Sequence, residues 1–165
     1  AKMSFAIKSA RLLTSAVNRN AARLVTQNRG YADEMAFTLA AANKVFYDAA
    51  SVRQVDVPSF SGSFGILPKH VPTLAVLRPG VVSVYENDGN VKKVFVSSGT
   101  VTVNEDASVQ VLAEEAHPIE NLDASACREI LSSAQSQLSS ASTDTDRAEA
   151  QIAVEVAEAL VKAAE

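Results

Sequence analysis

The side chains of this sequence best suited to nucleophilic, acid–base or metal chemistry are two histidines and one cysteine, His70, His117 and Cys127. A cysteine–histidine pair could form a nucleophile and its base, but no sequence signature links these residues. The two histidines lie far apart in the chain, and a metal site needs several ligands at close spacing. Cys127 falls on the apolar face of an expected helix, where a small buried hydrophobe is the usual interpretation. We therefore expect no catalytic residue, no metal and no cofactor.

Residues 61–80 form a turn-rich stretch with three of the six glycines and three of the five prolines. Gly62 and Gly65 can adopt backbone angles closed to other residues, and the prolines fix φ, so the stretch predicts tight turns and short strands. A Walker loop would need Gly, four residues, then Gly-Lys-Ser/Thr, whereas here the two glycines are three apart and Lys69 precedes a histidine. The spacing excludes this kind of phosphate site and leaves His70 as a turn or contact residue.

Charge is distributed unevenly along the chain. Residues 1–31 hold six basic residues and no acidic one, so the other 134 residues carry nine basic and 19 acidic residues, a net charge of −10. Such an acidic body repels the phosphates of nucleic acid, and we expect no nucleic-acid partner. A single cysteine permits no internal disulfide. No apolar run approaches the roughly 20 residues of a membrane-spanning helix.

Residues 1–31 have the composition of a mitochondrial transit peptide. Basic residues are scattered among serines, threonines and apolar residues, a pattern typical of the amphipathic helices that the import machinery recognises. Arg29, Tyr31 and Ala32 form a pattern similar to the arginine-at-minus-three processing site of matrix proteins. We therefore expect the mature chain to begin at Ala32. A disordered basic tail is the alternative.

Short apolar runs with period-two alternation extend from Met35 to about His117 and predict β-strands. The runs fall in residues 45–57, 64–67, 74–77, 81–85, 91–96, 101–103 and 109–112. The polar sequences at 87–90 and 104–107 suit hairpin turns. Counted generously, the pattern gives about ten strands, as a two-sheet β-sandwich requires. We assign this sandwich to residues 32–118.

After Pro118 the chain has no glycine or proline, and alanine becomes its commonest residue. Asp123 is the expected N-cap of one helix, and a second helix is expected to begin near Asp144. Apolar residues recur at helical spacing: Cys127, Ile130, Leu131, Ala134 and Leu138, then Ile152, Val156, Ala159, Leu160 and Ala163. Residues 119–165 should therefore form an antiparallel helical hairpin that leans on the sandwich or on a partner. The predicted fold class is α+β, mainly β.

The turn-rich stretch resembles a known signature. That signature has the form Gly-x-x-Gly, Ile or Val, Leu or Tyr, Pro-x-His-x-Pro, then Leu and Pro-Gly, and residues 62–80 fit it in order. It marks the small central-stalk subunit of rotary F-type ATP synthases, called delta in mitochondria and epsilon in bacteria and chloroplasts. With its flanks at 52–58 and 95–99, the chain is similar to the mitochondrial delta members in particular. The resemblance covers nearly all of the chain after residue 31.

The resemblance implies a non-catalytic rotor subunit whose sandwich lies between the gamma subunit and the membrane c ring and transmits torque for proton-driven ATP synthesis. The implied partners are gamma, the c-ring subunits and the very small mitochondrial epsilon subunit. The implied location is the matrix side of the inner membrane, peripheral and not spanning. The residues implied on the c-ring side are Gly62, Ser63, Phe64, Gly65 and Leu67, and those on the gamma side are His70, Val71, Pro72, Thr73 and Leu74.

Some bacterial relatives bind ATP through an Ile/Leu-Asp-x-x-Arg-Ala motif at the start of the first C-terminal helix. The corresponding run here is 122–127, with Ala126 in place of the arginine. Losing such a charge-assisted phosphate contact removes on the order of 1.5 to 3 kcal/mol, so we expect no ATP binding. Two alternative functions stay open: a free-standing β-sandwich module that binds a ligand or peptide, and an enzyme that uses His70 or Cys127.

Overall fold

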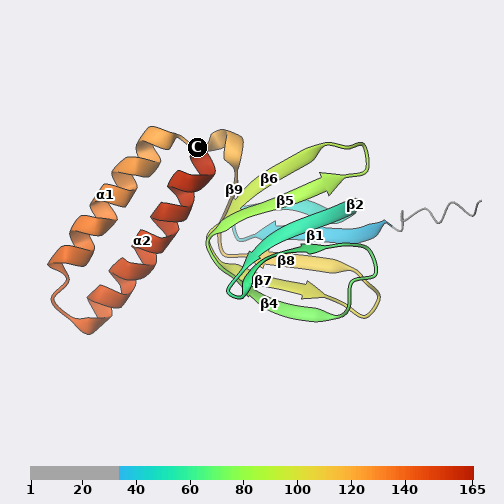
Figure 1. Ribbon diagram of the computed structural model, residues 1–165, viewed down its shortest axis with the longest axis horizontal. Coiled ribbons are helices and arrows are strands. Elements are labelled where there is room, and N and C mark those ends of the chain that lie inside the picture. Colours follow the sequence, from blue (N-terminus) through green and yellow to red (C-terminus); the bar gives the residue numbers. More distant parts are fainter. Residues whose placement is uncertain (1–33) are drawn as a thin grey trace, which may run out of the picture.

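The computed structural model describes residues 34–165 as a β-sandwich with a helical hairpin at one end (Figure 1). In this part of the chain nine strands are followed by one short 3-10 helix and two α-helices. The arrangement is the predicted α+β, mainly β class. The expected transit peptide, residues 1–31, and its processing residues Arg29, Tyr31 and Ala32 lie outside the described residues.

Most of the strands coincide with the apolar runs of the sequence, because alternating side chains place every second residue in the core. Their bounds are β1 (Met35–Ala41), β2 (Val45–Ser59), β3 (Gly62–Ile66), β4 (Thr73–Leu77), β5 (Gly80–Glu86), β6 (Val91–Val96), β7 (Gly99–Val103), β8 (Val109–Ala113) and β9 (Ala116–Pro118). The structure adds β1 and β9 to the seven predicted runs.

The longest strand, β2, takes part in both layers of the sandwich. Its first half pairs with β1, and its second half pairs with β3 on one side and β5 on the other. Ala49, with a φ of 45°, and shifts of register mark the bend between the halves. One layer runs β3-β2-β5-β6-β9 and the other β2-β1-β8-β7-β4. β1 and β8 form a parallel pair, while the other pairs of the described sheet are antiparallel.

The core between the two layers consists mainly of β-branched residues, which suit a pleated surface. The side chains with no exposed surface are Phe37, Leu39, Val55, Ile66, Val82, Val84, Val96, Val101 and Val111. Burying one such side chain stabilises the fold by roughly 1.5–3 kcal/mol. A core of this kind fixes the relative position of the strands that carry the surface loops.

Both predicted polar turns are hairpin connections. Residues 87–90 join β5 to β6, where the Glu86 N–H donates to Asn90 O at 2.9 Å and Gly89 has a φ of 91°. Residues 104–108 join β7 to β8, where the Asn104 N–H donates to Ser108 O at 2.9 Å. The turn residues therefore set the register of these two pairs.

The hairpin consists of α1 (Ala124–Ser140) and α2 (Asp144–Ala164), preceded by the 3-10 helix η1 (Ile119–Asn121). Asp123 is the N-cap of α1, as predicted, and its carboxylate accepts from the Ser125 N–H at 2.8 Å. Thr143 caps α2 in the same way through the Asp146 N–H. Asp123 thus marks the start of α1, and Thr143 marks the start of α2 after the turn that joins the helices.

The seam between α1 and α2 is made of small residues. Its buried members are Cys127 and Ala134 on α1 and Ala150 and Ala157 on α2. The interpretation of Cys127 as a small buried hydrophobe is confirmed. The predicted apolar stripes are wrong at Ile130 and Ile152, which are 51% and 62% exposed. Alanine lets the helices approach closely, so the seam lies on the alanine side of each helix and leaves the isoleucines outside.

The hairpin meets the sandwich through α2 and η1. α2 packs against β5, and η1 packs against both β6 and α2, so α1 lies on the far side of α2 from the strands (Figure 1). Phe95 on β6 is only 3% exposed, although its neighbours Val94 and Val96 are the ones that belong to the sandwich core. Its ring is therefore buried on the outer face of the sheet, on the strand that η1 packs against.

Candidate functional site

The signature stretch begins as a β-hairpin. β3 pairs with β2 from Ser59–Gly62 to Val55–Ile66, which leaves Phe60 and Ser61 at the tip. The buried Ser59 hydroxyl donates to Gly62 O at 2.7 Å and lies 2.9 Å from the Ser61 hydroxyl. Phe60 is 72% exposed. Sequence reasoning did not select Phe60; its position among serines just before a glycine is the signal of a hairpin tip.

The two signature glycines of this hairpin are needed for different reasons. Gly62 has a φ of 120°, a conformation that side chains rarely adopt. Gly65 does not have a positive φ, so the conformational expectation is wrong for this residue. A Cβ added to Gly65 would instead lie 2.8 Å from Asp56 Oδ1. Gly65 therefore provides space and Gly62 provides backbone freedom.

A short loop then leads from β3 to β4. The His70 N–H donates to Leu67 O at 3.1 Å, and Lys69 between them has a φ of 64°. The Thr73 hydroxyl donates to Val71 O at 2.9 Å. The imidazole of His70 lies 6.2 Å from the ring of Phe64, centroid to centroid. The structure thus brings one residue of the predicted gamma side into contact distance with one of the predicted c-ring side.

The predicted gamma-side segment continues into a broad outer face of the sheet. Leu74 is 74% exposed, and Val76 and Leu112 are also exposed. Strand pairing places outward side chains of β4, β7, β8 and β1 in two rows, Leu74–Thr102–Gln110–Thr38 and Val76–Thr100–Leu112–Ala40. We call these eight residues the uncharged face. None of them carries a charge, although the chain as a whole is 21% charged.

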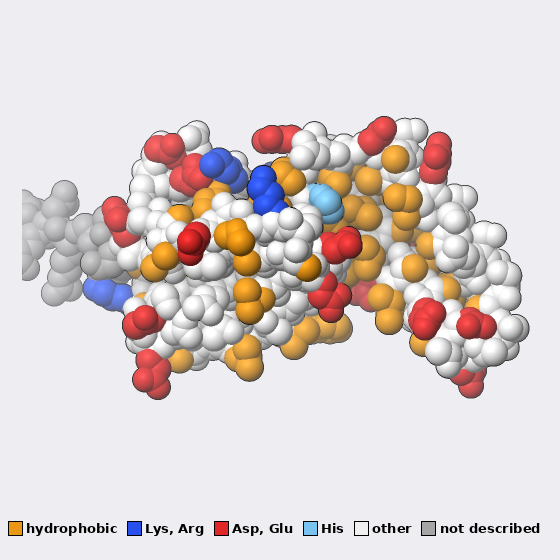
Figure 2. Space-filling view, turned by 180° about the vertical axis from the view of Figure 1, so that it is seen from behind, with side chains coloured by type: hydrophobic (Ala, Val, Ile, Leu, Met, Phe, Trp, Pro, Cys, Tyr) orange, Lys and Arg blue, Asp and Glu red, His pale blue; other side chains and the backbone are white. Residues whose placement is uncertain are grey.

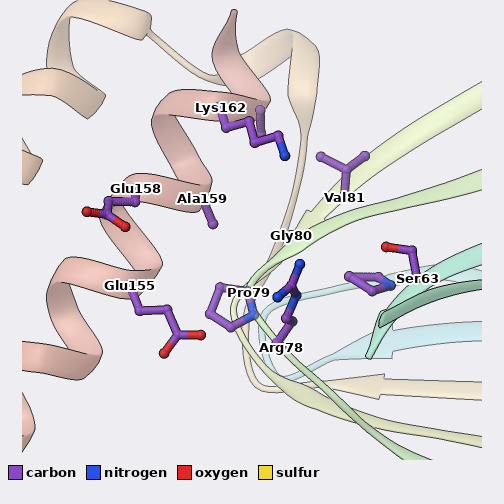
Figure 3. Close-up of a pocket in the computed structure, with 11 residues that line it drawn as sticks. Ser63, Arg78, Pro79, Gly80, Val81, Glu155, Glu158, Ala159 and Lys162 are labelled. Carbon is purple, nitrogen blue, oxygen red and sulfur yellow. The ribbon is translucent and has the colours of Figure 1, made fainter. Parts of the chain in front are cut away.

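A cleft of about 350 Å³ separates α2 from the sandwich (Figure 3). Arg78, Pro79 and Gly80 line it from the strand side, and Glu155, Ala159 and Lys162 line it from α2. Figure 2 shows hydrophobic side chains gathered where the hairpin meets the sandwich and acidic side chains spread over both. The charged residues of the cleft are two carboxylates and two cations, a balance that does not favour a triphosphate.

One polar cluster joins three strands near the start of β2. The Tyr47 hydroxyl donates to Glu86 Oε1 at 3.0 Å, and Lys92 Nζ lies 2.8 Å from the same oxygen. Burial and the hydrogen bond to Glu86 raise the pKa of Tyr47 above its ordinary value. The cluster keeps Tyr47 protonated and holds β2, β5 and β6 together.

The residues considered for catalysis are not gathered into one site. Cys127 is buried in the helical seam, His70 lies in the loop before β4, and His117 is exposed on β9. Among residues 34–165 no group of three or more His, Cys, Asp or Glu has a geometry that could hold a metal ion. No helix in this range combines the length and the apolar character needed to cross a membrane.

Two family sequence models match successive parts of the chain. Residues 34–119 match the ATP synthase delta/epsilon chain β-sandwich domain, and residues 122–163 match the C-terminal domain of the metazoan delta subunit of F1F0-ATP synthase. The chain belongs to the ATP synthase delta/epsilon family. This membership favours the stalk interpretation over a free-standing ligand-binding module.

Several relatives match over most of their length. The mitochondrial ATP synthase subunit delta of Caenorhabditis elegans is 49% identical over 150 residues, covering 85% of this chain and 91% of the relative. The same subunit of Agaricus bisporus is 39% identical over 157 residues, covering 93% and 96%. Both names belong to the delta branch of the family, as the flanks of the signature indicated.

Solved structures share the fold. A chain in the Euglena gracilis mitochondrial ATP synthase, in a structure of its OSCP, F1 and c-ring, matches with a TM-score of 0.73 and 25% identity, covering 80% of this chain and 82% of that one. A chain of the Tetrahymena thermophila central stalk and c-ring matches with a TM-score of 0.61 and 16% identity, covering 79% and 96%. The second likeness supports the fold alone.

Proposed function

We propose that this chain is a non-catalytic central-stalk subunit of F1Fo ATP synthase that connects the gamma subunit to the c ring and transmits torque. Family membership supports the complex. The observation that carries the finer assignment is the pair of exposed surfaces on one rigid sandwich: the β2–β3 hairpin with its loop, and the uncharged face. A coupling subunit needs two contact surfaces on a body that does not deform between them.

The uncharged face is assigned to gamma. The segment that leads into it is assigned to gamma as well and consists of His70, Val71, Pro72, Thr73 and Leu74. Contiguous exposed apolar surface on a soluble domain commonly marks a protein interface. Threonine and glutamine among Leu74, Val76 and Leu112 supply hydrogen-bonding groups without a charge to desolvate. This surface therefore suits a permanent partner whose own contact surface is also uncharged.

The hairpin side is assigned to the c ring through Gly62, Ser63, Phe64, Gly65 and Leu67, to which the exposed Phe60 is added. Ser63 stands where many bacterial members carry an acid, so the contact uses hydroxyl and backbone hydrogen bonds. The small mitochondrial epsilon subunit is assigned as a further neighbour. ATP is not a ligand in this proposal, because Ala126 replaces the phosphate-binding arginine.

The proposal divides the chain into a transit peptide at 1–31, a coupling sandwich at 32–118 and a bracing hairpin at 119–165. It places the mature protein on the matrix side of the mitochondrial inner membrane, bound to the complex and not inserted in the lipid. Mass spectrometry of the protein from purified ATP synthase should find an N-terminus at or within a few residues of Ala32. An intact residue 1 in the assembled protein would contradict the processing site.

The test of the gamma assignment is co-purification. Tagged chain should recover gamma and c subunits, and Leu74→Glu or Val76→Glu should lose gamma because a carboxylate would be buried without a partner. Val91→Glu is the matched control, since Val91 is an exposed apolar residue on β6, away from the uncharged face. Recovery of gamma by Leu74→Glu at the level of the control would exclude this surface.

A further inference from the structure

Asp56 occupies a central position on the outer side of the sheet. It lies on β2, with Gly65 of β3 opposite it on one side and Ser83 of β5 on the other. Its chain neighbours Val55 and Val57 point into the core and are buried. The carboxylate of Asp56 therefore stands over the sheet at the point where three strands meet.

Both oxygens of this carboxylate accept a hydrogen bond. Gln54 Nε2 donates to Oδ1 at 2.7 Å, and the Tyr85 hydroxyl of β5 donates to Oδ2 at 3.0 Å. We call Gln54, Asp56 and Tyr85 the Asp56 cluster. The two bonds fix the carboxylate in one rotamer, and the bond from Tyr85 connects β2 to β5 through side chains.

The side chains of Asp56 and Gln54 lie directly over the backbone of Gly65. A Cβ at this position would come within 2.8 Å of Asp56 Oδ1 and 3.2 Å of Gln54 Nε2. Real Cβ atoms essentially never show contacts under about 3.0 Å, so the side-chain ends of Asp56 and Gln54 would have to shift. Since the φ of Gly65 is not positive, the backbone alone does not demand glycine. The carboxylate of Asp56 occupies the space that a side chain at position 65 would fill.

β3 is held to the sheet by a single partner strand. In the described sheet β3 pairs with β2 alone, so its other edge has no strand beside it. Its angle against the rest of the layer is set by its ladder to β2 and by what packs on its faces. The Asp56 cluster packs on the outer face of this hairpin and anchors it to β5.

We propose that Asp56 is a positioning residue: its carboxylate, held by Gln54 and Tyr85 over the bare backbone of Gly65, sets the orientation of the β2–β3 hairpin against β5. The consequence for coupling rests on the proposed function, because that hairpin carries the residues assigned to the c ring. Gly65 then serves the rotor through Asp56 and not through a contact of its own.

Tyr85 reports on the cluster in the full chain without any partner. The hydrogen bond to Asp56 and the charge of Asp56 raise the pKa of Tyr85, while Arg53 acts in the opposite direction. Asp56→Ala should therefore lower the pKa of Tyr85 toward its ordinary value. Gly65→Ala should lower it in the same direction, because the added methyl group displaces the carboxylate. NMR titration of ring-labelled tyrosine, assigned with Tyr85→Phe, measures each tyrosine separately.

Val45→Ala is the control, since Val45 is an exposed residue at the start of β2, outside the Asp56 cluster, and the pKa of Tyr85 should stay unchanged. Asp56→Asn removes the charge without changing volume, so it reproduces the shift even if Gly65→Ala folds poorly. The proposal is overturned if the pKa of Tyr85 in Gly65→Ala equals that in the wild-type protein, or if Asp56→Asn does not change this pKa.

Coupling is tested in membranes that carry the assembled enzyme. Gly65→Ala and Asp56→Ala should each lower proton-driven ATP synthesis, and the double variant should lose no more than the larger single loss, because both changes break one unit. If the double variant instead loses ATP synthesis by the product of the two single losses, Gly65 makes a ring contact of its own and does not act through Asp56. If the Tyr85 shifts occur but no variant lowers synthesis, Leu74→Glu included, the positioning of β3 stands and the stalk function fails.

Discussion

The sandwich and the helical hairpin are stabilised by different means, although they belong to one chain. The sandwich buries whole side chains of valine, leucine, isoleucine and phenylalanine between two layers. The hairpin buries only alanines and one cysteine and leaves Ile130 and Ile152 in solvent. Area removed from water sets most of the stabilisation, so the sandwich holds itself together and the hairpin depends on what it leans against.

The largest effect is expected in the sandwich core. Leu39→Ala should lower the free energy of unfolding by about 2–5 kcal/mol, because Leu39 has no exposed surface and its loss leaves a cavity. Chemical denaturation followed by circular dichroism measures this loss. Leu112→Ala, at an exposed position on β8, should change stability by less than about 0.5 kcal/mol. Equal losses for the two variants would mean that the core is not where the stability lies.

Removing residues 123–165 separates the two regions. The sandwich should still unfold cooperatively, with a loss of roughly 1.5–3 kcal/mol if Phe95 becomes exposed when the hairpin is absent. Assembly should weaken, but ATP hydrolysis by the assembled complex should not rise, because without a nucleotide contact there is no ligand to favour one hairpin position. Micromolar ATP binding by calorimetry, or a several-fold rise in hydrolysis with assembly intact, would make the hairpin a regulator.

Overpacking the seam should loosen the hairpin alone. Ala157→Leu places three extra carbons where 1% of the residue is exposed, at a cost of about 1–3 kcal/mol. Hydrogen exchange should speed up in α1 and α2 while β-strand amides keep their protection. The control is Ala126→Leu, on the exposed side of α1. Faster exchange throughout the strands would show that the two regions are one cooperative unit.

The smallest effect concerns the first helical turn. Asp123→Ala removes the acceptor for the Ser125 N–H and should destabilise α1 by about 1 kcal/mol. Exchange at the amides of residues 125 and 126 is the measurement. Ser125→Ala leaves the cap in place and should preserve protection there. An unchanged exchange rate in Asp123→Ala would exclude the cap as a source of helix stability.

Local chemistry made much of this fold predictable. Turn residues at 87–90 and 104–107, the N-cap Asp123 and the period-two runs each act over a few residues, and each is confirmed. Pairing between distant strands is not encoded in such short windows, so the parallel contact of β1 with β8 and the role of β9 were missed. The hairpin seam was predicted in part: Cys127 and Ala134 are buried as expected, but Ile130 and Ile152 are exposed because the seam on α2 uses Ala150 and Ala157 instead.

The candidate site was predictable in outline only. Residues 62–74 of the signature were located by their glycines and prolines, and they lie on one hairpin, one loop and the start of β4. The local sequence could not predict why position 65 needs glycine, since the carboxylate above it belongs to Asp56 on the opposite strand. The uncharged face is likewise spread over four strands, and it becomes visible only when their registers are known.

The bend in β2 determines how the sandwich responds to force. This strand of 15 residues pairs with β1 in one layer and with β3 and β5 in the other. A twisting force applied to the uncharged face, which includes β1, reaches the β2–β3 hairpin as tension along one continuous backbone. The covalent backbone of β2, in addition to the packing of side chains in the core, then opposes sliding of one layer against the other. The sandwich should therefore resist twisting about the axis of β2, because one continuous strand joins its two layers.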